Sequence, residues 1–91
     1  MSENTMVYLD ALIRYKKAYL SLKEDLTQQK KEVYESGVRL KQQCHDDSVS
    51  EGFLAELGVI ILDIEGYIKN IDKVLELMDS HIKKVQDILH I

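Results

Sequence analysis

Apolar residues recur at every seventh position over the second half of the chain. A strand has no reason to keep a seven-residue repeat over five heptads, whereas a helix packed along another helix does. We therefore predict a long helix over about 51–90, with Ser48 and Glu51 forming a capping-box pattern at its start. One repeating row is Leu54, Ile61, Ile68, Leu75, Ile82 and Leu89, and the other is Leu57, Ile64, Ile71, Met78 and Val85.

The first half of the chain carries a weaker form of the same repeat. Its main row is Leu12, Tyr19, Leu26, Val33 and Leu40, and a companion row of Tyr8, Tyr15 and Leu22 turns polar at Gln29, Ser36 and Gln43. This pattern predicts a first helix over about 4–45. Gly37 leaves open an alternative in which this helix breaks near 36–38. The turn is predicted at about 46–50, because Asp46 and Asp47 suit the start of a helix and not its end.

Together the two helices predict an all-α fold, a long antiparallel helical hairpin (a two-helix coiled coil) in a single domain over 1–91. At one register the main row of the first helix meets apolar partners throughout. The seam then pairs Leu12 with Val85, Tyr19 with Met78, Leu26 with Ile71, Val33 with Ile64 and Leu40 with Leu57. The flank at that register pairs Lys16 with Asp79, Lys23 with Asp72 and Lys30 with Glu65. Charges favour this pairing, since residues 1–45 hold eight basic and six acidic side chains and residues 46–91 hold four and ten.

The second helix has more apolar residues than one neighbouring helix can cover. A third row of Ile60, Tyr67, Val74 and Ile88 is interrupted by His81. Apolar residues at about three positions in seven are typical of helices in three- or four-helix bundles. We therefore predict that this row binds a partner, either a second copy in a homodimer or another helical protein.

Composition agrees with a helical protein and bears on its expected cellular location. The 91 residues allow one domain, and the absence of Pro leaves little material for β-turns. Cys44 is the single cysteine, so no internal disulfide is expected, and the N-terminus does not resemble a signal peptide. The apolar run over 53–62 is shorter than the roughly 20 residues that span a membrane, so we expect no membrane insertion. We expect a cytoplasmic protein, with signal-peptide-independent export left open.

Candidate chemical sites in the sequence are few. Residues 44–47, Cys-His-Asp-Asp, are of metal-ligating types, but adjacent residues converge poorly from a helix end. His81 and His90 are expected at the far end of the hairpin. The sequence has no Gly-rich phosphate loop and no Ser-His-Asp arrangement. We expect no catalytic residues, no metal and no cofactor.

The expected function is a non-enzymatic protein–protein interaction module that acts as an adaptor, an assembly factor or a secretion chaperone. The alternative is a nucleic-acid-associated regulator, because residues 14–19 interleave basic side chains with Tyr15 and Tyr19. A net charge of −4 disfavours it, and we expect Tyr8, Tyr15 and Tyr19 in the core with their hydroxyl groups at its edge. We therefore expect no nucleic-acid partner.

Size, a central turn and two long helices resemble the WXG100-type hairpins that Gram-positive bacteria secrete with small helical partners. The resemblance is one of architecture. The sequence has no Trp, its turn region reads Glu51-Gly52-Phe53, and Ile71 stands four residues after Tyr67 where those proteins carry an acid. It implies a helical partner and nothing finer.

Overall fold

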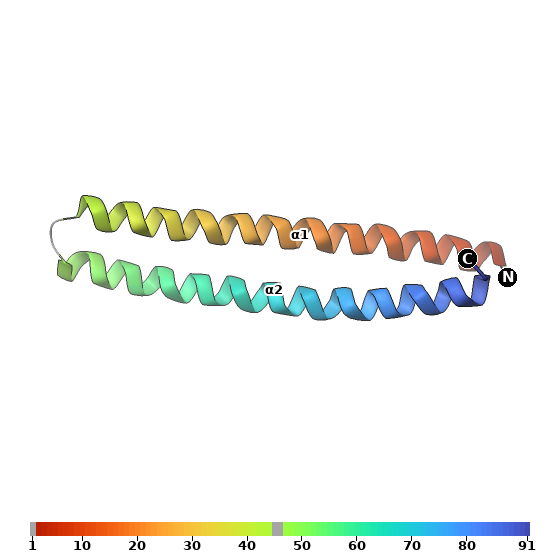
Figure 1. The fold of residues 1–91 in the computed structure, drawn as a ribbon. Coiled ribbons are helices and arrows are strands. Elements are labelled where there is room, and N and C mark those ends of the chain that lie inside the picture. Colours follow the sequence, from red (N-terminus) through yellow and green to blue (C-terminus); the bar gives the residue numbers. More distant parts are fainter. Residues whose placement is uncertain (1, 45–46) are drawn as a thin grey trace. The chain divides into compact units, whose positions relative to one another are not determined.

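Two long helices make up the part of the chain that the structure describes. The computed structural model describes residues 2–44 and 47–91, with helix α1 over Ser2–Gln43 and helix α2 over Asp47–Leu89 (Figure 1). Within these ranges no strand occurs. The predicted all-α helical hairpin is therefore confirmed. None of the described helices is both long and apolar enough to cross a membrane.

The ends of the helices differ in detail from the prediction. Helix α1 continues through Gly37, so the alternative of a break near 36–38 is wrong. Helix α2 begins at Asp47, earlier than the predicted 51, and Ser48 lies in its first turn instead of preceding it. Of the turn predicted at 46–50, residues 47–50 are helical, and Asp46 lies outside the described residues.

The last turn of α2 ends in a Schellman arrangement. The N–H of Ile91 donates to the carbonyl oxygen of Gln86 at 3.1 Å, and the N–H of His90 donates to that of Asp87 at 3.3 Å. His90 has a φ of 60°, the left-handed conformation that glycine adopts at least cost. A side chain therefore occupies a position that favours glycine.

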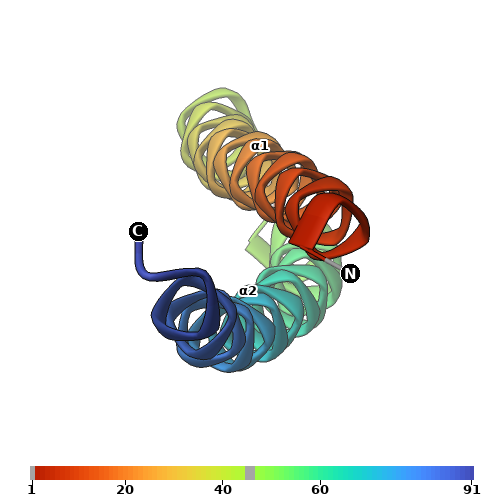
Figure 2. The same ribbon diagram turned by 90° about the vertical axis from the view of Figure 1, so that its right-hand side faces the viewer.

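The chain divides into two compact units, one of residues 1–23 with 70–91 and the other of residues 24–69. In the first unit the start of α1 pairs with the end of α2, and both chain termini belong to this unit (Figure 2). Its core is a cluster of Leu9, Ile82 and Val85, against which Leu12, Ile13 and Leu89 pack. Leu9 is the most deeply buried apolar side chain of the core, at 4% exposure.

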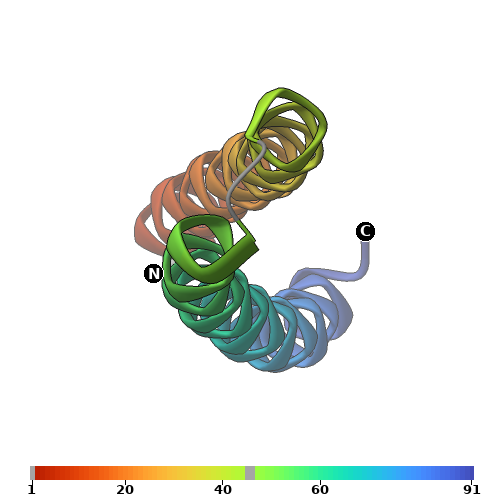
Figure 3. The ribbon, with the colours of Figure 1, turned by 90° about the vertical axis from the view of Figure 1, so that its left-hand side faces the viewer.

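The second unit contains the end of α1 and the start of α2 (Figure 3). In its described part, 24–44 and 47–69, Gly37 and Ser50 are buried, and the large apolar side chains are half-buried or exposed. A Cβ at Gly37 would lie 3.2 Å from Cδ1 of Leu57 and 3.3 Å from Cδ2 of Leu54. Glycine therefore lets α1 approach these leucines closely.

Lysine ion pairs set the antiparallel register within each unit. In the first unit Nζ of Lys16 lies 2.5 Å from Asp79, and Nζ of Lys23 lies 2.6 Å from Asp72. In the second unit Nζ of Lys30 lies 3.1 Å from Glu65. All three predicted pairs are confirmed.

The prediction for the companion row of α1 was wrong. Tyr8, Tyr15 and Leu22 are exposed by 48, 57 and 45%, so Tyr8 and Tyr15 are not the core residues that the pattern suggested. The row that packs beside Leu12 and its repeats is instead buried or half-buried, and it consists of Leu9, Lys16, Lys23, Lys30, Gly37 and Cys44. Lysine suits this place because its aliphatic stem covers apolar surface while the ammonium group meets the acids of α2.

Candidate functional site

The residues predicted to form the seam between the helices are all at least half-buried. Ile71 and Val85 are buried, and eight others are half-buried: Leu12, Tyr19, Leu26, Val33, Leu40, Leu57, Ile64 and Met78. Leu12 packs against the cluster that contains Val85. Their burial leaves the more exposed surfaces of the two helices for an additional partner.

The row predicted to bind a partner is largely exposed. In the second unit Ile60 and Tyr67 are exposed. In the first unit Ile88 is 71% exposed, whereas Val74 is half-buried. Most of this row is therefore accessible to another molecule.

His81, which interrupts that row, contacts the other helix of the first unit. Its Nε2 lies 2.8 Å from the hydroxyl oxygen of Tyr8, within hydrogen-bonding distance. The two rings meet edge to face, with centroids 5.7 Å apart and an interplanar angle of 84°. The rows of Tyr8 and of His81 therefore lie on the same side of the first unit.

A second helix-packing stripe runs along this side of the first unit, and we call it the outer seam. On both helices its residues are spaced alternately by three and four, the spacing that faces a neighbouring helix. On α1 it consists of Tyr8, Ala11, Tyr15, Ala18 and Leu22, and on α2 of Val74, Leu77, His81, Lys84 and Ile88. All of them except the half-buried Val74 are exposed. Ala11, Ala18 and Leu77 were missed from the sequence, although the three–four spacing could have found them.

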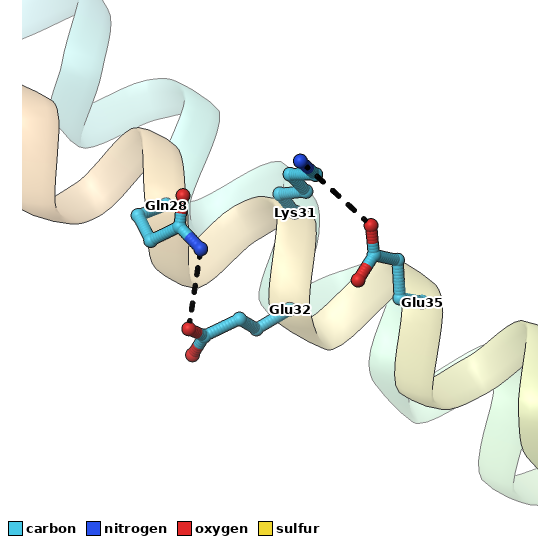
Figure 4. Close-up of polar contacts among 4 residues, drawn as sticks. All are labelled: Gln28, Lys31, Glu32 and Glu35. Atoms are coloured by element: carbon cyan, nitrogen blue, oxygen red, sulfur yellow. Dashed lines mark hydrogen bonds and ion pairs between the residues drawn. The ribbon is translucent and has the colours of Figure 1, made fainter.

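The α1 stripe turns polar in the second unit. Its continuation is Asp25, Gln29, Glu32, Ser36 and Arg39. Nε2 of Gln28 donates to Glu32 at 3.3 Å, and Lys31 and Glu35 approach within 4.0 Å (Figure 4). Nη2 of Arg39 donates to the hydroxyl of Ser36 at 3.4 Å. Such local pairs on one helix suit a solvent-facing surface.

A small apolar groove lies between the α1 row of the outer seam and the half-buried Tyr19. Tyr15, Ala18, Tyr19 and Leu22 line it, and its volume is about 250 Å³. The rings of Tyr15 and Tyr19 form one wall, with centroids 5.2 Å apart. A hydrogen bond with Tyr15 raises the pKa of Tyr19, and the Coulombic effect of Tyr15 and burial add to this rise. The groove can receive an apolar side chain.

The second unit has a groove of its own, also of about 250 Å³. A Cβ at Gly58 would meet no atom within 4 Å, so this glycine leaves open space in the groove and is not needed for helix contact. The lining is mostly apolar and consists of Val33, Tyr34, Gly37, Val38, Lys41, Leu54, Leu57, Gly58 and Ile61.

Potential metal ligands are dispersed over the described part of the chain. Within residues 2–44 and 47–91, no group of three or more His, Cys, Asp or Glu side chains is placed to hold a metal ion. Of the Cys-His-Asp-Asp stretch, Cys44 is half-buried, and His45 and Asp46 lie outside the described residues. Exposed apolar rows and two grooves are also present on the described part of the chain. The chain matches no protein-family model, and comparisons with curated proteins and with solved structures gave no match.

Proposed function

We propose that this protein is a non-enzymatic protein–protein interaction module whose hairpin completes its hydrophobic core on a helical partner. An adaptor, an assembly factor or a secretion chaperone would act in this way. The observation that carries the proposal is the outer seam, an uncovered stripe with helix-packing spacing on both helices of the first unit.

Exposed apolar surface gives the driving force for such binding. Among the described residues, five apolar side chains are buried, whereas seventeen large apolar ones are exposed. Full burial of one such side chain contributes about 1.5–3 kcal/mol. A partner that covers a few of them therefore gains enough free energy to offset part of the cost of association.

Surface charge gives less support to the alternative of nucleic-acid binding. Lys16, in the basic and aromatic stretch of α1, is paired with Asp79, and Arg14 lies 3.1 Å from Asp10. These carboxylates offset the positive charge that would attract phosphate groups. Protein binding is therefore the proposal that we develop.

Photo-cross-linking in the cells that produce the protein tests this function. A photoreactive amino acid replaces Leu22 or Leu77 in the outer seam, and matched controls carry it at Gln28 or Leu62, which are exposed but lie outside that seam. We expect discrete cross-linked products at the two seam positions and little product at the controls. Equal labelling at all four positions, or no product at any of them, would contradict the proposal.

A further inference from the structure

The groove on α1 has the geometry of a hole in a coiled coil. In such packing, a knob side chain enters a space between four residues of the facing helix at positions i, i+3, i+4 and i+7. Tyr15, Ala18, Tyr19 and Leu22 stand at this spacing and line one groove. Ala18 provides the open floor because its side chain is a single methyl group. The hole therefore fits an apolar side chain presented by a helix.

The outer seam offers room for two helices. Its α1 and α2 rows lie on the same side of the first unit, as the contact between Tyr8 and His81 shows. One added helix would cover one groove of this surface, whereas a helical hairpin presents two helices with matching spacing. The shape of the surface thus suits a second hairpin.

Charge along the outer seam permits two identical copies to face each other. The α1 row from Tyr8 to Leu22 has no charged residue, and Lys84 is the one Lys, Arg, Asp or Glu in the α2 row. Like charges at the centre of a symmetric interface would oppose self-association. This surface brings few of them together.

The chain exposes more surface than a typical folded monomer of its mass, and the excess is large enough for a dimer interface. The accessible surface is 7188 Å². A folded monomer of 10.5 kDa exposes about 5,400 Å² by the usual scaling with mass. The excess of about 1,800 Å² is summed over both units, and a standard interface needs roughly 800 Å² per partner, so less than half of this excess would have to lie on the outer seam.

We infer that the outer seam binds a second copy of this chain to form a four-helix bundle. Leu77 of the second copy is the knob assigned to the hole of Tyr15, Ala18, Tyr19 and Leu22. It is 72% exposed and is the second of the five residues of the α2 row. This inference rests on the proposed function and names the partner for the same surface.

A pair of matched substitutions tests the inference by sedimentation velocity of the full chain. Ala18→Glu places a carboxylate in the hole, and Ala55→Glu makes the same change at an exposed alanine of the second unit outside the outer seam. Wild type and Ala55→Glu should sediment as dimers, with twice the mass of 10.5 kDa. Ala18→Glu should weaken the dimer by about 100-fold or more, because its charge would be buried without a partner. Its helicity by circular dichroism should match that of Ala55→Glu.

A second pair keeps the inference testable if Ala18→Glu unfolds. Leu77→Lys removes the knob, and Leu62→Lys changes a similarly exposed leucine outside the outer seam. Dimer loss in Leu77→Lys alone supports the assignment, and equal behaviour of the two variants overturns it.

The wild-type mass separates this inference from the proposed function. A wild-type monomer at about 200 µM overturns self-association. If cross-linked products of another mass then appear at Leu22 and Leu77, the interaction module stands with a different partner. If no product appears either, both proposals fail.

Discussion

Two truncations at adjacent positions, Leu9→Ala and Tyr8→Ala, test which of the two side chains belongs to the core of the first unit. The quantity compared is the loss of unfolding free energy. Leu9 is 4% exposed and belongs to the cluster with Ile82 and Val85. Tyr8 is 48% exposed, and its hydroxyl reaches His81 at the surface. Both variants are made in the Ala18→Glu background, so that self-association does not contribute to the measured stability.

The expected magnitudes differ because the two side chains differ in burial. Truncation of a buried leucine removes its transfer free energy and leaves a cavity, which costs about 2–5 kcal/mol. Truncation of the half-exposed Tyr8 removes contacts that solvent can reach. This loss costs about 1 kcal/mol or less. Since a domain of this length has roughly 5–14 kcal/mol of total stability, Leu9→Ala should remove a large part of it.

Urea denaturation followed by circular dichroism measures both variants. With a slope of about 1–3 kcal/mol per molar urea, the midpoint for Leu9→Ala should fall by about 1 M or more, and that for Tyr8→Ala by much less. An equal or larger loss in Tyr8→Ala would refute our assignment, because Tyr8 would then occupy the core row of α1.

Three further sets of substitutions test the end of α2, the glycines and one ion pair. His90→Gly should raise the unfolding free energy by about 1 kcal/mol in urea titrations, since glycine adopts the positive φ of 60° without a Cβ penalty. An unchanged unfolding free energy would contradict the strain assigned to His90. Gly66→Ala should stabilise α2 by about 0.5–1 kcal/mol because its Cβ would enter open space, whereas Gly37→Ala should gain less stability because atoms of Leu54 and Leu57 lie within 3.3 Å of the added Cβ. Equal melting temperatures of the two variants would argue against the close approach of α1 to these leucines. A double-mutant cycle on Lys23 and Asp72 should give a coupling of about 0.2–1 kcal/mol that shrinks in 1 M salt, and a coupling insensitive to salt would exclude a solvent-screened pair.

Much of the fold follows from the heptad pattern, but the companion row of α1 does not. Leu9 and Tyr8 both stand at helix-packing distance from Leu12, and the row of Tyr8, Tyr15 and Leu22 is the more apolar of the two. The pattern therefore favoured the tyrosines. Helix pairing instead places Lys16 and its repeats inward, because acids at Asp79, Asp72 and Glu65 stand opposite. Counting apolar residues misses such a row, whereas testing charge pairs at a register finds it.

The proposed binding surface could be recognised from the sequence only in part, for a related reason. The sequence marked Ile60, Tyr67, Val74 and Ile88 as surplus apolar residues on α2. It assigned their counterparts on α1 to the core, which left the α1 half of the outer seam unrecognised. Ala18 has so little apolar surface that it gave no signal alone, yet it forms part of the hole. Its importance follows from the spacing of its neighbours.

Thiol accessibility tests most directly whether the outer seam is buried in an assembly. Ala18→Cys and Ala55→Cys, each in a Cys44→Ser background, are alkylated at protein concentrations from about 1 to 200 µM. We predict that alkylation at position 18 slows by about 10-fold or more as the concentration rises, while alkylation at position 55 stays constant. Equal rates at the two positions over the whole range would contradict the account.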